Sequence, residues 1–100
     1  MSSHSERHRV CLVIGTRPEA IKMAPLVRAI EASADLSGLV CVTGQHRAML
    51  DQVLSFFGIV PDIDLDVMVP NQTLNGLMSR VLARLDEALA THRPDYVLVH

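Results

Sequence analysis

The chain has 100 residues, which is enough for one small domain, and 49% of them are hydrophobic. A net charge of −2, with one tyrosine and two phenylalanines as the aromatic residues, gives no electrostatic or stacking basis for binding nucleic acid. No apolar run approaches the roughly 20 residues of a membrane-spanning helix, and the polar start lacks the apolar centre of a secretion signal. We expect a cytoplasmic protein that binds neither nucleic acid nor membrane.

Residues 1–9 form a polar tail for which we expect disorder, and residues 10–100 alternate between strand and helix patterns without a linker. The expected strands are 10–14, 39–43, a weaker edge strand at 63–68, and 96–99, and the expected helices are 18–32, 46–57 and 72–92. Pro25 predicts a kink or a short first segment in the first helix. The helix at 72–92 has the clearest apolar spacing, which predicts that it is the mainstay of the core.

The first two expected strands are apolar without alternation, which is typical of parallel strands covered on both faces. Short alternating strands and helices favour a parallel sheet joined by right-handed crossovers. The predicted fold class is therefore α/β, a Rossmann-like parallel sheet with helices on both faces.

A turn with the sequence GTRPE, beginning at Gly15, is the most informative local feature. Pro18 suits the first turn of a helix, and Glu19 is an acid where the helix dipole favours one. We expect free backbone N–H groups to point out of this turn beside Arg17, whose guanidinium fits phosphate oxygens. Lys22 lies about one turn further along the helix. The residues predict an anion-binding turn; the alternative is that Arg17 and Lys22 are ordinary solvated charges.

Ligands of such sheets bind at the carboxyl ends of the strands. The turn at Gly15, the segment 44–47 and whatever follows His100 should therefore line one edge of the sheet. His46 in that segment could hydrogen-bond a sugar or a phosphate, and the alternative is a satisfied surface histidine at a helix start.

No metal site and no nucleophile with an adjacent base are predicted. His4 and His8 are four residues apart but lack a third ligand, and the acidic run at 62–66 lacks the glycine and the distal glutamate of a calcium loop. Cys11 and Cys41 fall inside apolar strands, which predicts buried thiols and no disulfide.

Three blocks of sequence, in this order and at this spacing, closely resemble the non-hydrolysing UDP-N-acetylglucosamine 2-epimerases. They are GTRPEAIKMAPL at 15–26, then VT at 42–43 with QHR at 45–47 and MLDQVL at 49–54, and PD at 94–95 with VLVH at 97–100. The resemblance implies that residues 10–100 are the N-terminal Rossmann-like domain of a two-domain glycosyltransferase-B-type architecture. A Gly-Asp-Thr segment with a catalytic aspartate and a stretch with catalytic glutamates follow in the family. We therefore expect this chain to be the N-terminal part of a longer enzyme.

The resemblance implies a full enzyme that interconverts UDP-N-acetylglucosamine and UDP-N-acetylmannosamine by eliminating UDP and adding it back. Such an enzyme needs no cofactor, is usually a homodimer and supplies surface polysaccharide biosynthesis. Arg17 matches the family arginine that contacts the diphosphate, and Lys22 matches a substrate-binding lysine. The catalytic acids lie beyond His100, so the resemblance places no catalytic residue in this chain and implies that the fragment alone is inactive.

A second, allosteric site for UDP-N-acetylglucosamine exists in some bacterial members of the family. Gln45 and His46 match two of its residues. Ala48 and Asn71 stand where those members have a glutamine and an arginine, which departs from the allosteric pattern.

Two alternative functions remain open from the sequence. One is a hydrolysing epimerase that releases free N-acetylmannosamine from the same substrate. The other is a non-catalytic anion-binding domain that ends at His100.

Overall fold

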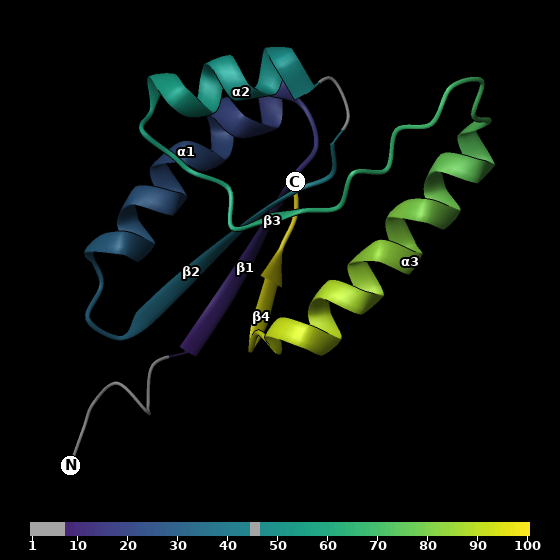
Figure 1. Cartoon of the computed structure of the whole chain (residues 1–100). Coiled ribbons are helices and arrows are strands. Elements are labelled where there is room, and N and C mark those ends of the chain that lie inside the picture. The colour runs from purple at the N-terminus through teal and green to yellow at the C-terminus, as the bar shows by residue number, and fades with distance from the viewer. Residues whose placement is uncertain (1–7, 45–46) are drawn as a thin grey trace.

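The computed structural model describes residues 8–44 and 47–100, which form one parallel sheet with helices on both faces (Figure 1). The strands are β1 (His8–Ile14), β2 (Leu36–Val42), β3 (Ile63–Asp64) and β4 (Tyr96–Leu98), and the helices are α1 (Arg17–Ala32), α2 (Arg47–Phe56) and α3 (Leu74–His92). The strand order is β3-β2-β1-β4. Helices α1 and α2 lie on one face and α3 on the other, which confirms the predicted α/β class. Of the predicted tail, residues 1–7 lie outside the described residues, and β1 begins at His8.

Strands β1 and β2 pair in parallel along their whole length, from His8 opposite Leu36 to Ile14 opposite Val42. Alternate residues of the two strands enter two separate cores. The strand residues buried in the core that includes α1 and α2 are Val10, Leu12, Ile14, Val40 and Val42. The strand residues buried in the core against α3 include Cys11, Leu39 and Cys41. Burial on both faces explains why these strands are apolar without alternation, as predicted.

The two cysteines are buried free thiols, which confirms the prediction for them. They lie on neighbouring strands and belong to the same core cluster. The Cys41 thiol donates a hydrogen bond to Cys11, and this bond together with burial raises the pKa of Cys41. Both side chains therefore act as small apolar core residues.

Helix α1 runs unbroken through Pro25, where the sequence predicted a kink or a short first segment. Pro25 cannot donate to the carbonyl of Ile21, and both residues are exposed, so water can satisfy that carbonyl. The opposite side of the helix is its buried face, which consists of Ala20, Met23, Ala24, Val27 and Ile30. This face packs on β1 and β2 and holds the start of the helix at the end of β1.

Helix α2 ends where the sequence predicted, just before Gly58. That glycine has a left-handed φ of 70°, which allows the chain to turn out of the helix. Its N–H donates to the carbonyl of Ser55 at 3.0 Å. Leu50 and Leu54 are buried against α1 and the sheet.

Strand β3 lies at the edge of the sheet, as predicted, but is shorter than the expected 63–68. Asp66 has a left-handed φ of 51°, which ends the regular strand. Its N–H donates to Oδ1 of Asp64 at 2.9 Å, a local bond that competes with strand pairing. Leu65 and Val67 nevertheless stay buried and reach the second core.

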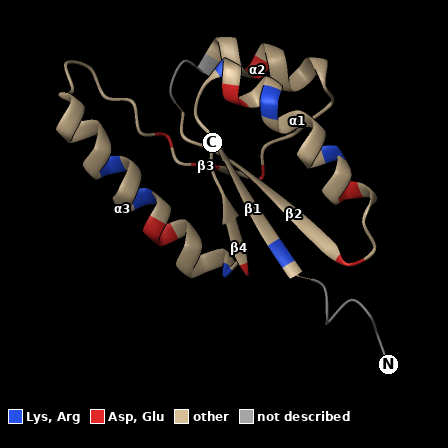
Figure 2. Ribbon diagram, turned by 180° about the vertical axis from the view of Figure 1, so that it is seen from behind, with Lys and Arg blue, Asp and Glu red and all other residues tan. Residues whose placement is uncertain are grey.

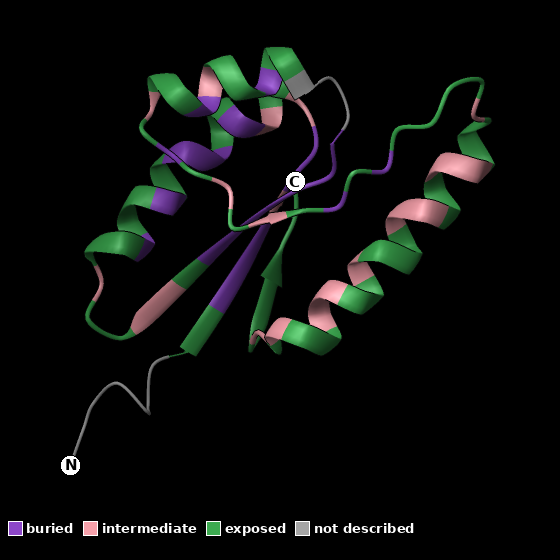
Figure 3. Ribbon diagram, viewed as in Figure 1, coloured by how far each residue is buried: buried purple, intermediate pink, exposed green. Residues whose placement is uncertain are grey.

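The prediction that the helix at 72–92 is the mainstay of the core is wrong. No residue of α3 is buried in the described structure, and Figure 3 shows the helix as intermediate and exposed throughout. Its inner stripe, which packs half-buried on the second core, consists of Leu77, Val81, Leu85 and Ala88. Leu74, Met78 and Leu82 form a second stripe that is exposed. The apolar residues of α3 thus extend around more of the helix than the sheet can cover.

The start of β4 is fastened to β1 by Asp95. Its Oδ2 accepts from the N–H of Arg9 at 2.7 Å, and its own N–H donates to the Arg9 carbonyl at 2.8 Å. Nη1 of Arg9 donates to the carbonyl of His92 at 2.8 Å. These bonds set β4 beside β1, so that residues following both strands leave from the same edge of the sheet.

Replacing Leu54 by alanine should lower the free energy of unfolding by about 2–5 kcal/mol, because Leu54 is only 2% exposed. Leu82 is 63% exposed, and Leu82→Ala should cost about 0.5 kcal/mol or less. Urea denaturation of the 100-residue chain measures both values. Equal losses of unfolding free energy would mean that the second stripe of α3, which contains Leu82, is covered in solution.

Replacing Asp95 by alanine should cost about 1 kcal/mol, because the Arg9 N–H loses its carboxylate acceptor. Asp86 is an exposed acid on α3 and provides the matched control, with little expected effect. Hydrogen exchange should show faster exchange of the Arg9 amide in Asp95→Ala alone. Unchanged protection of that amide would contradict the role given to Asp95.

Candidate functional site

The strand order makes the carboxyl ends of β1 and β4 a candidate position for a ligand. The chain passes from β1 outward to β2 and β3, then returns to add β4 on the other side of β1. Turns that leave such neighbouring strands in opposite directions open a crevice at the carboxyl edge of the sheet. The turn at Gly15 follows β1, and Val99 and His100 follow β4. These two segments therefore leave from the same edge of the sheet, where the sequence predicted the ligand.

The turn itself differs from the prediction in one respect. The N–H groups of Gly15 and Thr16 are not free, because both donate to Oε1 of Glu19, at 2.7 and 2.9 Å. Pro18 has no N–H to offer. Glu19 occupies the third helical position after the Thr16 cap, where a glutamate can reach back to the chain before the helix. The expectation of free backbone donors is wrong for these two residues.

Arg17 is the group of this turn that remains available to an anion. Its side chain is exposed, and no ion pair or side-chain hydrogen bond of Arg17 is found within residues 8–44 and 47–100. It borders two hollows. One, of about 330 Å³, is lined by Thr16, Arg17, Pro18 and Met49. The other, of about 320 Å³, is lined by Arg17, Ile21, Gln52, Val53, Phe56 and Phe57.

The surroundings of Arg17 suit a ligand with both a charged and an apolar part. Figure 2 shows basic and acidic residues interspersed along the helices. Anion binding at Arg17 therefore depends on the side chains next to it more than on the net charge of the chain. A guanidinium without a protein partner can bind phosphate oxygens through two parallel hydrogen bonds. The neighbouring side chains of α2, including Met49 and Phe56, offer exposed apolar surface.

Lys22 is also exposed, but it lines neither of the hollows beside Arg17. The two residues are five positions apart on α1, which separates them by about 140° around the helix axis. The structure thus does not bring Lys22 onto the side of the helix that Arg17 occupies. Its substrate-binding role stays a prediction.

At the end of β2, the carboxyl edge contains a buried threonine and a required glycine. Oγ1 of Thr43 is buried and has no hydrogen-bond partner among the described residues. Gly44 has a φ of 94°, and a Cβ there would lie 2.9 Å from the Asp66 Cα, so only glycine fits. Gln45 and His46, the predicted allosteric residues, lie outside the described residues.

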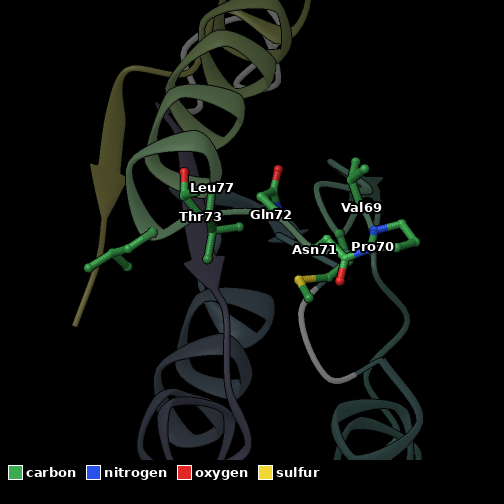
Figure 4. Close-up of a pocket in the computed structure, with 8 residues that line it drawn as sticks. Val69, Pro70, Asn71, Gln72, Thr73 and Leu77 are labelled. Carbon is green, nitrogen blue, oxygen red and sulfur yellow. The ribbon is translucent and has the colours of Figure 1, made fainter.

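Another hollow lies elsewhere on this edge and has a volume of about 700 Å³. Figure 4 shows it between the loop before α3 and the first turn of that helix. Its lining consists of Met68, Val69, Pro70, Asn71, Gln72, Thr73, Leu74 and Leu77. Asn71, which the resemblance places where the allosteric members have an arginine, has a left-handed φ of 61°. Because none of the described lining residues carries a charge, these residues are poorly suited to a diphosphate.

Glu19 is the residue that sequence reasoning undervalued. The pattern Thr-x-x-Glu before an apolar helix is the signature of a reciprocal helix cap, and it was present at Thr16 and Glu19. The helix dipole alone explains why an acid is favoured there but not which groups it binds. The cap would have predicted that the backbone donors are already occupied.

The described part of the chain contains no group of three His, Cys, Asp or Glu side chains placed to hold a metal ion. None of the helices in that part has an apolar stretch that would reach across a bilayer.

Comparison with known proteins gives a consistent assignment. The family model described as UDP-N-acetylglucosamine 2-epimerase matches residues 28–100. The UDP-N-acetylglucosamine 2-epimerase of Salmonella typhimurium is 56% identical over 92 residues, which cover 92% of this chain and 24% of that protein.

Solved structures agree with this assignment. The UDP-GlcNAc 2-epimerase of Neisseria meningitidis bound to UDP-GlcNAc has a TM-score of 0.86 at 48% identity, over 92% of this chain and 25% of that one. The S. aureus MnaA–UDP structure has a TM-score of 0.87 at 48% identity, over 93% and 24%. The chain spans about a quarter of the length of these relatives. From the matched residues and this similarity, the chain belongs to the UDP-N-acetylglucosamine 2-epimerase family.

Proposed function

We propose that the full-length protein is a UDP-N-acetylglucosamine 2-epimerase that interconverts UDP-N-acetylglucosamine and UDP-N-acetylmannosamine. The observation that carries the proposal is the exposed Arg17 at the carboxyl edge of β1, which has no ion pair with any described residue, in a chain that is 56% identical over 92 residues to a named epimerase. Relatives solved with UDP-GlcNAc and with UDP support a nucleotide sugar as the ligand.

The reaction breaks and remakes two bonds. Loss of the proton at carbon 2 and of UDP at carbon 1 gives a glycal, and UDP then returns to carbon 1 as a proton is added to the other face of carbon 2. Charge on the diphosphate grows as the bond to carbon 1 breaks. Arg17 stabilises that charge in both directions, because UDP is first the leaving group and then the nucleophile.

The groups that move the proton at carbon 2 lie outside these 100 residues. Glu19 is the acid nearest in sequence to Arg17, and its Oε1 is already bonded to two backbone N–H groups. This part of the enzyme therefore binds and stabilises the diphosphate without supplying the base. Lys22 is also proposed to bind substrate, from a side of α1 that lies about 140° around the helix axis from Arg17.

We further propose a cytoplasmic homodimer whose product enters surface polysaccharide biosynthesis, as the family resemblance implies. Gln45 and His46 are the candidate residues of a second UDP-N-acetylglucosamine site, in which Ala48 and Asn71 weaken ligand contacts. Light scattering of the full-length protein tests the dimer. Rates measured across UDP-N-acetylglucosamine concentrations test activation by a second substrate molecule.

The hydrolysing alternative differs in its products. A hydrolase yields free N-acetylmannosamine and UDP, whereas the proposed enzyme yields a nucleotide sugar. The named relatives are UDP-N-acetylglucosamine 2-epimerases, which favours the nucleotide sugar. A non-catalytic anion-binding domain would bind UDP without forming either product.

Replacing Arg17 by alanine in the full-length enzyme should raise KM and lower kcat by about 10²–10³-fold, as expected for loss of one charged donor to the transition state. Arg17→Lys should recover part of the loss, because it keeps the charge but not the planar fork. Arg28, which pairs with Glu31 on α1 at 3.5 Å, provides the control, and Arg28→Ala should leave the kinetics unchanged. Steady-state kinetics that are unaltered in Arg17→Ala would remove Arg17 from the site.

The 100-residue chain alone should bind UDP weakly and form no UDP-N-acetylmannosamine, because it lacks groups that move the proton at carbon 2. Proton NMR of the chain incubated with UDP-N-acetylglucosamine measures this, with the full-length enzyme as the positive control. Turnover by the purified chain would show that a base lies within these residues.

A further inference from the structure

We propose that Glu19 is a positioning residue, whose carboxylate holds the turn from which Arg17 reaches the diphosphate. This role rests on the proposed function, because the proposed function gives Arg17 its ligand. Glu19 does not touch the substrate. It acts through the backbone on either side of the arginine.

A single carboxylate oxygen spans the junction between strand and helix. Oε1 of Glu19 accepts from the N–H of Gly15 at 2.7 Å and from that of Thr16 at 2.9 Å. Thr16 is the extended cap of α1, with φ −132° and ψ 167°, and its carbonyl accepts the helical bond from the N–H of Ala20 at 3.0 Å. The Glu19 side chain thus ties the exit of β1 to the first turn of α1, and Arg17 lies inside the loop so closed.

No second acceptor for the N–H of Gly15 or Thr16 is found in the described part of the chain. Gly15 is buried, so water cannot easily replace the carboxylate there. Pro18 fixes its own φ and restrains Arg17 before it, but it does not hold the two preceding residues. Loss of the carboxylate therefore loosens the backbone that aims the arginine side chain.

Glu19 also decides which group of the turn meets the phosphate. Backbone N–H groups at the start of a helix attract anions, and here the protein's own carboxylate occupies two of them. The guanidinium of Arg17 is left as the exposed cation of the turn. We therefore place the diphosphate at the tip of this side chain, which makes the direction of the side chain important for the rate.

The test uses the full-length enzyme with Glu19→Ala, Glu19→Gln, Arg17→Ala and the double variant Glu19→Ala/Arg17→Ala. Glutamine keeps a carbonyl oxygen at the same reach, so it can still accept from both N–H groups. Val27, which is buried on the same helix, provides the control for stability, because Val27→Ala destabilises α1 without touching the turn.

Glu19→Ala should lower kcat/KM by about tenfold, mostly through kcat, as expected for a group coupled to a neighbour that acts in the transition state. The kcat/KM of Glu19→Gln should stay within about threefold of the wild-type value. In the Arg17→Ala background, adding Glu19→Ala should lower kcat/KM by less than about twofold. An equal loss with and without Arg17 would overturn the positioning role. The role would also be overturned if Val27→Ala, at the same melting temperature as Glu19→Ala, lowered kcat/KM by the same factor.

Calorimetric titration with UDP separates this role from the proposed function. Glu19→Ala should weaken UDP binding when Arg17 is present and leave it unchanged when Arg17 is alanine. If the wild-type protein binds UDP but forms no UDP-N-acetylmannosamine, the proposed epimerase activity is refuted. The comparison of UDP binding in the single and double variants then still decides the role of Glu19. A wild-type protein that does not bind UDP would refute both.

Discussion

The parallel pairing of β1 with β2 is the constraint on which the rest of the structure depends. Because both faces of this pair are buried, its register is fixed, and a slip by one residue would exchange the two cores. The pairing therefore places the turns after Ile14 and Val42 at the same edge of the sheet. Asp95 then adds β4 on the free side of β1, next to the strand whose following turn carries Arg17, where we place the diphosphate.

At this edge, the protein satisfies its own backbone and leaves a side chain open. The donors of the turn at Gly15 are used by Glu19, while Arg17, two residues away from that glutamate, has no ion pair among the described residues. A backbone closed in this way is fixed before ligand arrives, and preorganised charge is worth more than charge that must be ordered during the reaction. In the function that we propose, specificity for a diphosphate depends on the guanidinium of Arg17 and on the apolar side chains of α2 beside it.

Features set by local sequence were predictable, and features set by covering surfaces were not. The apolar runs of β1 and β2, the stop at Gly58 and the edge position of β3 follow from neighbouring residues, and the structure confirms them. The exposure of α3 could not be predicted in this way. Helical periodicity shows which residues of the helix are apolar, but it does not show how many of them the sheet can cover. Asp66 ended β3 early through a left-handed conformation that no spacing rule indicates. At the site, residue type left open whether Arg17 binds an anion, and the family resemblance made it the predicted ligand, a role that stays a prediction. The occupied donors of Gly15 and Thr16 could have been predicted only from the helix cap.

The most direct measurement is proton NMR of the full-length protein incubated with UDP-N-acetylglucosamine in deuterated water. Removal and replacement of the proton at carbon 2 predicts UDP-N-acetylmannosamine that carries deuterium at that carbon, with the nucleotide still attached. Free N-acetylmannosamine with released UDP, or a nucleotide sugar without exchange at carbon 2, would contradict the epimerase account.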